Sequence, residues 1–336
     1  MWDNILGHTQ QKKFLQRYLN AQERPHALLF VGAEGLGKKQ LALEFAKTLL
    51  CANHNGSDSC EACRLMNLAD GNLSHPDFLF VQREQDEKTG RYKDISKEQI
   101  LDLIGKSAFS PVMSDTKVCL IEDADRMTLV AANSFLKLLE EPPVGWVIIL
   151  LAADESKLLT TIMSRVVCLR FQPVPVEQVQ KLLEVKGIPA QQAAVLARIS
   201  EGSIGTALSL AEQEVFQFRQ QALAFLEALP LYTPMNYLAQ RIWQQKNFER
   251  PQALLLTKLW QLLLRDLLMC HLHLENKIYN CDLTTQLTAL ASGWRISGLK
   301  LALTTVQETY AALENSVGVR LALEAMALKI DQAYKE

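Results

Sequence analysis

Apolar residues in the first half of the chain follow two alternating patterns. Short continuous apolar runs bounded by turn residues predict buried strands of a parallel sheet. Between these runs, apolar positions recur at helical spacing. The predicted strands are 27–31, 78–81, 117–121, 146–151 and 166–169, and the predicted helices are 9–20, 38–50, 96–109 and 129–140. Strands that alternate with helices predict an α/β fold whose parallel sheet is covered on both faces.

The pattern changes after residue 171. Gln172-Pro173-Val174-Pro175 predicts a linker, and the sequence beyond it has helical spacing. Breaks between helices are expected near Pro189, Gly202, Pro230, Pro234, Asn276 and Gly298. We therefore expect three parts: an α/β domain over 1–171, a small helical domain over 172–212 and a helical bundle over 213–336.

Composition adds limits to this picture. The length of 336 residues suits two or three domains, and 49% apolar with 21% charged residues is typical of globular proteins. A net charge of -2 gives little attraction to nucleic acid, so we expect DNA contacts to come through an assembly.

No membrane contact is predicted. The first residues have neither a basic region nor an apolar run, so no signal peptide is expected. Lys258, Arg265 and Asp266 interrupt the apolar stretch 254–274, which favours a packed helix over a membrane span. Scattered cysteines inside apolar runs are typical of a cytoplasmic protein.

A glycine-rich segment follows the first predicted strand. Gly32, Gly35 and Gly37, followed by Lys38, have the spacing of a phosphate loop, in which backbone N–H groups and a lysine bind phosphates. The next residue of such a loop is Ser or Thr, whose hydroxyl ligates Mg²⁺. Lys39 stands there instead, and an ammonium group has no lone pair for a cation. The alternative is a purely structural turn.

An acidic pair follows the strand 117–121. Glu122 and Asp123 stand where carboxylates could hold Mg²⁺ and polarise a water molecule. The order is reversed relative to working ATPases of this kind, and Asp123 is one methylene short of the water-activating glutamate. The alternative is a solvated acidic turn in which Asp125 caps the next helix.

Three segments together resemble the AAA+ clamp-loader family of bacterial DNA polymerase III, and the altered phosphate loop and acidic pair are most similar to its delta-prime branch. They are the opening Trp2-Asp3-Asn4-Ile5-Leu6-Gly7-His8, the run Asn133-Ser134-Phe135-Leu136-Lys137-Leu138-Leu139-Glu140-Glu141-Pro142-Pro143, and Ser164-Arg165. The recognisable motifs cover about residues 1–212.

The resemblance implies a helical lid over 172–212 and a C-terminal collar over 213–336 that joins five subunits in a ring. The implied partners are an ATPase subunit, a clamp-opening subunit and, through the complex, the sliding clamp and primed DNA. The implied setting is the polymerase III holoenzyme, whose polymerase activity lies in another subunit.

The resemblance also assigns site residues. Ala153 stands where the family has a polar sensor, usually Thr, and Gly205 stands where active subunits have an arginine over the nucleotide. With Lys39 and the Glu122–Asp123 pair, four phosphate-handling positions are altered, so we expect no ATP hydrolysis, and ATP–Mg²⁺ binding stays open. Arg165 is retained, which implies an arginine finger that acts on a neighbouring subunit's ATP. The alternative is a surface arginine at a helix end.

Cysteines cluster in the insert 51–63. Cys60 and Cys63 have the spacing of a zinc-ligand pair, and Cys51 could add a third thiolate. Family members resembling this chain carry four cysteines here. His54 or Asp58 could supply the fourth ligand, and Ser57 stands where another cysteine would be expected. The alternative is a degenerate loop without metal.

Three hypotheses follow. The first is a non-hydrolysing clamp-loader subunit that supplies Arg165 to a neighbour. The second is an active AAA+ ATPase, either the motor subunit of the same loader or a related remodelling protein. The third is a zinc-dependent nucleic-acid-binding protein, which the lack of aromatic stacking residues in the insert disfavours.

Overall fold

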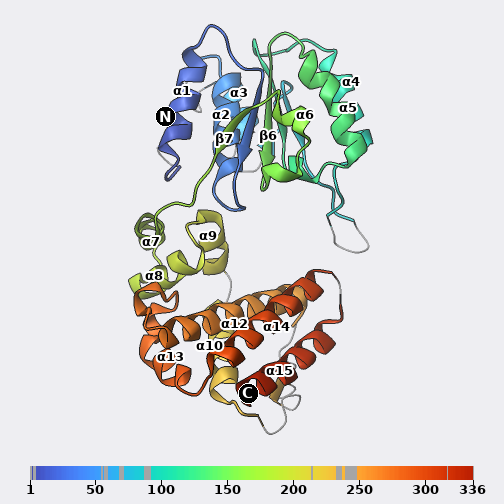
Figure 1. The fold of residues 1–336 in the computed structure, drawn as a ribbon. Coiled ribbons are helices and arrows are strands. Elements are labelled where there is room, and N and C mark those ends of the chain that lie inside the picture. Colours follow the sequence, from blue (N-terminus) through green and yellow to red (C-terminus); the bar gives the residue numbers. More distant parts are fainter. Residues whose placement is uncertain are drawn as a thin grey trace. The chain divides into compact units, whose positions relative to one another are not determined.

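The computed structural model describes residues 2, 5–53, 56, 60–67, 72–86, 92–212, 215–231, 237–238, 248–315 and 317–335. The chain divides into two compact units (Figure 1). The first comprises Met1–Pro175 with Gly202–Gly205, and the second comprises Val176–Glu201 with Thr206–Glu336. The division into three domains that the sequence predicts stays a prediction.

A five-stranded parallel sheet forms the centre of the first unit. Its order is β4-β5-β6-β1-β7. The strands are β1 (Ala27–Val31), β4 (Phe78–Val81), β5 (Lys117–Ile121), β6 (Trp146–Ala152) and β7 (Val167–Arg170). All five strands predicted from apolar runs are confirmed, and only the ends of the last two differ, by one residue.

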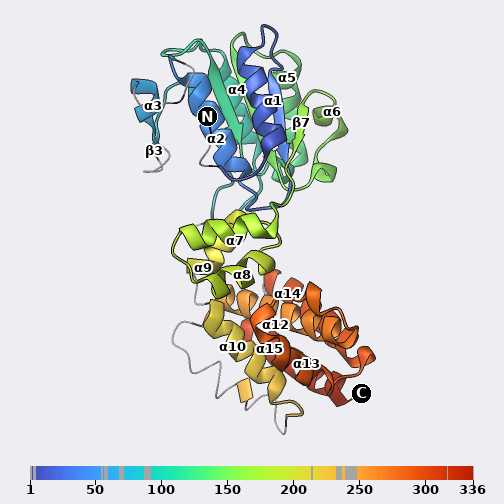
Figure 2. The same cartoon turned by 90° about the vertical axis from the view of Figure 1, so that its left-hand side faces the viewer.

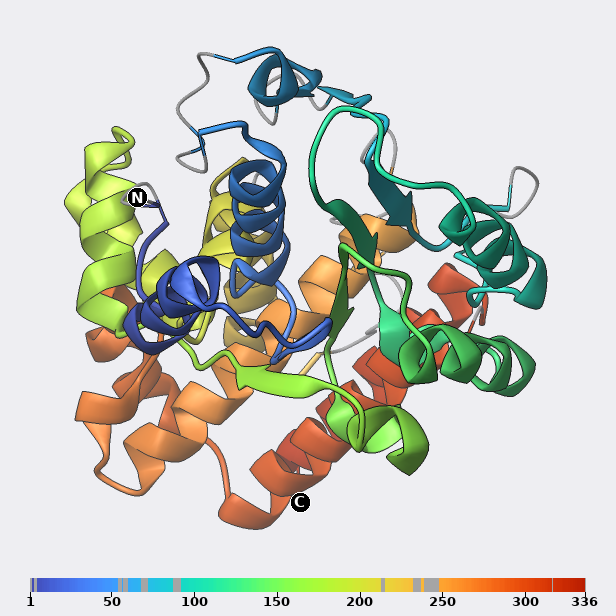
Figure 3. The same cartoon turned by 90° about the horizontal axis from the view of Figure 1, so that it is seen from above.

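Helices cover both faces of this sheet, as predicted (Figure 3). They are α1 (Thr9–Asn20), α2 (Lys38–Leu50), α4 (Lys97–Ser107), α5 (Leu129–Glu140) and α6 (Thr160–Met163). Because side chains alternate along a strand, Leu28 and Phe30 of β1 pack with α1 and α2, whereas Leu29 packs with α4 and α5 on the other face. All of β1, β5 and β6 is buried, which explains their continuous apolar sequences.

Side-chain caps determine where two of these helices begin. Helix α4 begins at a capping box, in which the Gln99 N–H donates to Ser96 Oγ and the Ser96 N–H donates to Gln99 Oε1. The suggestion that Asp125 caps α5 is wrong. Thr128 Oγ1 accepts the Ala131 N–H instead, and Asp125 accepts a bond from the Ala153 N–H at 3.3 Å.

The cysteine-containing insert forms short elements at the periphery of the first unit. These are α3 (Glu61–Leu65) and the antiparallel pair β2 (Met66–Asn67) and β3 (Asn72–Leu73). Figure 2 shows α3 and β3 away from the central sheet. The insert therefore adds to the α/β unit without interrupting the sheet.

The second unit is helical. Its helices are α7 (Val176–Val185), α8 (Ala190–Ile199), α9 (Ile204–Glu212, whose first two residues belong to the first unit), α10 (Val215–Glu227), α12 (Arg250–His271), α13 (Thr284–Ala291), α14 (Ile296–Glu314) and α15 (Val319–Lys335). The break expected near Gly298 lies earlier, because Gly298 is inside α14. A Cβ atom there would overlap the Ala333 carbonyl oxygen, so glycine lets α14 approach α15 closely.

The central helix of this unit is α12, which packs against α10, α13 and α14. It contains most of the apolar stretch 254–274, and Trp260 and Leu263 of this stretch are fully buried. Among the described residues, no helix is long and apolar enough to cross a membrane.

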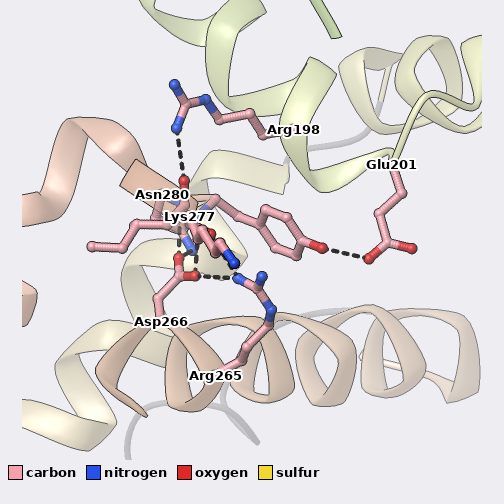
Figure 4. Close-up of polar contacts among 8 residues, drawn as sticks. Arg198, Glu201, Arg265, Asp266, Lys277 and Asn280 are labelled. Carbon is pink, nitrogen blue, oxygen red and sulfur yellow. Dashed lines mark hydrogen bonds and ion pairs between the residues drawn. The ribbon is translucent and has the colours of Figure 1, made fainter. Parts of the chain in front are cut away.

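A buried carboxylate organises one side of the second unit (Figure 4). Asp266 of α12 is fully buried and accepts hydrogen bonds from the backbone N–H groups of Tyr279 and Asn280 and from Asn280 Nδ2. Arg265 pairs with Asp266 at 3.0 Å and lies over the Tyr279 ring. The Tyr279 hydroxyl donates to Glu201, so this network joins α12 to the turn after α8. Its several donors compensate the cost of burying the charge.

Candidate nucleotide pocket, surface arginine and cysteine cluster

The glycine-rich segment has the shape of a phosphate loop. It connects β1 to α2, and Gly35 and Gly37 adopt positive φ angles of 72° and 88°. Glycine adopts these angles without a Cβ clash, so the backbone can turn around a small volume at the start of α2. The positive φ angles thus agree with the turn that the glycine spacing predicts, and nucleotide binding stays a prediction.

Lys38, however, binds the loop itself. Its Nζ atom donates to the carbonyl oxygens of Gly32 and Ala33, the second at 2.8 Å. The side chain is buried, and this burial lowers the pKa of Lys38, although nearby carboxylates, Glu34 first among them, oppose the shift. In this arrangement the ammonium group satisfies backbone acceptors of the loop.

Lys39 stands beside the acidic pair. Its Nζ atom lies 2.7 Å from Glu122 Oε2 and 5.0 Å from the centre of the Phe80 ring. A protein cation therefore pairs with the carboxylate that the sequence offers as a Mg²⁺ ligand. The predicted loop and the predicted acidic pair do come together, but they meet through this ion pair.

Asp123 has a different partner. Its carboxylate lies 3.9 Å from Arg83 Nη1, and its backbone is in the left-handed region with φ of 53°. Burial and the neighbouring Glu122 charge raise the pKa of Asp123, while Arg83 lowers it. The sequence gives no signal for Arg83, because a single arginine after a strand is part of no motif.

The segment after α8 lies directly on the phosphate loop. The Gly205 N–H donates to the Gly35 carbonyl oxygen at 2.8 Å, and Ser203 Oγ donates to the Glu34 carbonyl oxygen at 3.1 Å. A Cβ atom on Gly205 would lie 2.9 Å from Gly35 Cα, which is closer than Cβ atoms approach other heavy atoms. The arginine that the family's active subunits have at this position would require the loop or this segment to move.

His8 also contacts the loop. Its Nε2 atom lies 2.6 Å from the Leu36 carbonyl oxygen, its ring packs 4.7 Å from that of Phe171, and burial lowers the pKa of its imidazole. The sequence offered His8 only as part of the opening motif. A cleft of about 430 Å³ borders His8, between the start of α1 and the end of β7, but no residue of the phosphate loop lines it.

Arg165 lies at the surface, just before β7. Its Nη1 atom donates to the Thr161 carbonyl oxygen at 2.9 Å and to Ser164 Oγ at 3.0 Å, and its Nη2 atom donates to Glu140 Oε1 at 2.8 Å. The side chain is 35% exposed. Glu140 belongs to the motif 133–143, but the sequence alone gives this glutamate no role.

Sheet topology separates Arg165 from its own phosphate loop. Strands β1 and β7 are parallel neighbours, and Val31 pairs with Arg170. The loop follows the carboxyl end of β1, whereas Arg165 precedes the amino end of β7. At about 3.3 Å per residue, a separation of five residues along a strand corresponds to roughly 16 Å. Arg165 thus lies near the opposite end of these strands from the phosphate loop of its own chain.

The three cysteines of the insert are close together. The Sγ atoms of Cys51, Cys60 and Cys63 lie within 4.8 Å of one another, and those of Cys51 and Cys60 are 3.7 Å apart. Four thiolates around Zn²⁺, at Zn–S distances of about 2.3 Å, would be spaced by about 3.8 Å. The cluster could therefore hold a zinc ion. The suggested fourth ligands, His54 and Asp58, and Ser57 lie outside the described residues.

Comparisons with known proteins agree with this architecture. Residues 7–175 match the family model described as DNA polymerase III, delta subunit. The DNA polymerase III subunit delta' of Bacillus subtilis is 28% identical over 323 residues, which is 95% of each chain. That of Pseudomonas aeruginosa is 33% identical over 62% of each chain.

A solved gamma-subunit-related protein of Thermotoga maritima is 17% identical to this chain. The two structures align over 97% of this chain and 98% of the Thermotoga maritima chain, with a TM-score of 0.49. The family model covers half of the sequence, and the Bacillus subtilis relative covers nearly all of it. The chain therefore belongs to the family of DNA polymerase III delta' subunits.

Proposed function

We propose that this chain acts in DNA replication as a clamp-loader subunit that does not hydrolyse ATP and that supplies Arg165 to a neighbouring ATPase subunit. The observation that carries the proposal is a contrast within the first unit. Lys38 and Lys39 of the phosphate loop contact acceptors beside the pocket, namely loop carbonyl oxygens and Glu122. Arg165 precedes the opposite end of β7 and keeps two N–H groups without a partner among the described residues.

The absence of hydrolysis follows from what phosphoryl transfer needs. The reaction needs a hydroxyl and a carboxylate for Mg²⁺, a group that orients water, and donors that stabilise charge on the γ-phosphate. Lys39 has no lone pair for the metal and neutralises Glu122. Ala153 has no polar side-chain atom, and Gly205 has no side chain and no room for one.

The role of Arg165 follows from its chemistry. A guanidinium group stays charged at all physiological pH values and presents a fork of donors that matches phosphate oxygens. Two of its five N–H groups, the one on Nε and one on Nη2, have no hydrogen-bond partner within the described part of the chain. These donors are available to a phosphate on another subunit.

The remaining elements of the proposal concern the assembly. The chain would join an ATPase subunit and a clamp-opening subunit in a five-membered ring through residues 213–336, and would contact the sliding clamp and primed DNA within that ring. The names of the relatives and the family support this setting. Polymerase activity would lie in another subunit, and the complex would work in the cytoplasm.

The test is ATP turnover of a reconstituted loader that contains Arg165→Ala. We expect DNA-stimulated turnover to fall at least several-fold, because supplied arginine fingers contribute about 10³ to 10⁵ in rate at the site they serve. Arg170→Ala is the matched control, since Arg170 is also exposed, is the last residue of β7 and pairs with Glu155. Unchanged turnover with Arg165→Ala would refute the finger.

A second assay separates this proposal from an active ATPase. The purified chain, incubated alone with Mg²⁺ and ATP, is expected to release phosphate at the rate of the buffer. Rapid release that Lys38→Met abolishes would favour the ATPase alternative.

We also propose that the cysteine cluster holds a structural zinc ion. Thiolates are the ligands that Zn²⁺ prefers in structural sites, and the spacing of the cysteines fits one ion. Metal analysis of protein purified without chelator should find about one zinc per chain, and Cys60→Ser should lose it. Cys281→Ser is the control, because Cys281 lies outside the cluster. Equal metal content in both variants would refute the site.

A further inference from the structure

Several hydrogen bonds hold the Arg165 side chain in place. Three acceptors surround one part of the guanidinium group: the Thr161 carbonyl oxygen, Ser164 Oγ and Glu140 Oε1, all within 3.0 Å. Ser164 Oγ itself donates to the Thr161 carbonyl oxygen, so these contacts support one another. Holding a long side chain in this way costs rotamer entropy, which a single contact at the surface does not usually offset.

The backbone on both sides of this arrangement is anchored in the core. Helix α6 carries Ile162, which is fully buried, and the Arg165 N–H donates to the Ile162 carbonyl oxygen at 2.9 Å. Glu140 ends α5, and the preceding Leu138 and Leu139 are buried in the same cluster. The two ends of the Arg165–Glu140 pair thus rest on elements that pack together.

The position of Glu140 is unfavourable for α5 alone. The carboxyl end of a helix carries partial negative charge, so a carboxylate in the last turn is disfavoured unless a cation lies beside it. Lys137 is the basic residue of this turn, but the partner of Glu140 is Arg165. Helix stability therefore gives no reason for a glutamate here, whereas the contact with Arg165 does.

We propose that Glu140 is a positioning residue for Arg165, which fixes the guanidinium group so that its Nε–H and remaining Nη2–H groups face outward. The inference rests on the proposed function, because it assigns the fixed arginine to a neighbour's phosphate. A donor set that is already oriented needs no reorganisation when charge develops on that phosphate. Glu140 itself does not touch the nucleotide.

A second ion pair in the same region provides the comparison. Arg170 pairs with Glu155 at 3.0 Å, and both side chains are more than a third exposed. Arg170 has no third acceptor like Ser164 among the contacts of the described residues. Removal of Glu155 therefore reports the effect of losing an ordinary surface pair beside β7.

The experiment compares reconstituted loaders that carry Glu140→Gln, Glu140→Asp, Glu155→Gln, Arg165→Ala or Arg165→Ala with Glu140→Gln. Because a half-exposed ion pair contributes modestly, Glu140→Gln should lower the DNA-stimulated kcat about two- to fivefold. The KM for ATP should stay unchanged, since the neighbour's pocket is intact. Glu140→Asp, which keeps the charge, should recover part of the rate, and Glu155→Gln should match the wild type.

The double variant decides whether Glu140 acts through Arg165. In the Arg165→Ala background, Glu140→Gln should cause no further loss. The inference is refuted if Glu140→Gln alone has the wild-type kcat, or if it lowers kcat equally in both backgrounds. If the proposed finger role is wrong, Arg165→Ala itself leaves turnover unchanged, which is a different outcome. Complex assembly is measured by mass for each variant, and the isosteric Gln at this half-exposed position keeps the fold.

Discussion

The phosphate loop and Arg165 lie at opposite ends of the neighbouring strands β1 and β7, and their charged side chains have different contacts. In the loop, Lys38 binds backbone carbonyl oxygens and Lys39 pairs with Glu122. Just before β7, Arg165 contacts three acceptors and has two N–H groups without a partner among the described residues. The lysines of the loop contact groups beside their own pocket, whereas we propose that the remaining donors of Arg165 serve a partner subunit.

Under the proposed function, the pocket would have lost its reaction while its fold persists. The loop has its glycines, its position after β1 and its lysine, and Gly35 and Gly37 have positive φ angles. Lys38 and Lys39 contact groups of this chain where a nucleotide and Mg²⁺ would bind in a working site. The proposed role of Arg165 depends on the nucleotide of another subunit. Changes in the phosphate loop of its own chain therefore do not affect that role.

Among changes near the phosphate loop, Gly205→Arg is expected to have the largest effect on stability. The new side chain would meet the Gly35 backbone, and overpacking of this kind costs about 1–3 kcal/mol. We expect a lower thermal unfolding midpoint and faster amide hydrogen exchange at 32–39. Gly105→Arg is the control, because open space surrounds a Cβ atom there. Equal unfolding midpoints for the two variants would mean that the segment 202–205 does not pack closely on the phosphate loop.

A smaller effect is expected from Lys39→Thr, which restores the hydroxyl of a working loop. Because the Lys39–Glu122 pair is partly exposed, its loss should cost at most about 1 kcal/mol in urea unfolding. Lys106→Thr, which breaks the exposed pair with Asp102, is the matched control. Phosphate release by the chain alone should stay at background, since Ala153 and Gly205 are unchanged. Restored Mg²⁺-dependent hydrolysis would make Lys39 the sole block.

The smallest effect concerns the pH dependence of stability at Lys38. Burial lowers the pKa of Lys38 below its ordinary value of 10.5, so the unfolded chain binds more protons in the window below that value. The Lys38 contribution to stability therefore rises as pH increases through this window. The rise should be absent in Lys38→Met, which urea unfolding of both proteins at several alkaline pH values can measure. Parallel profiles would mean that the Lys38 ammonium is not desolvated.

Local patterns predicted most of the first unit and less of the second. The five apolar runs of the sheet are predicted correctly because each depends on neighbouring residues. Gly298 was assigned to a break because glycine disfavours helices, but close packing of α14 on α15 outweighs that preference. The proposed cap at Asp125 was wrong for a similar reason, since that carboxylate binds the distant Ala153 backbone.

The sequence by itself determined the order of strands and helices in the first unit, the phosphate-loop spacing and the lysine at position 39, which are encoded by residue type and short-range spacing. The resemblance to the family marked Ala153 and Gly205 as altered positions. Only the tertiary structure decided which distant residues contact one another. Arg83 with Asp123, Glu140 with Arg165, and Gly205 with Gly35 are each separated by many residues in sequence, and chain folding brings them within contact distance. No local pattern carries that information, because the contacts arise from the order in which strands and helices pack.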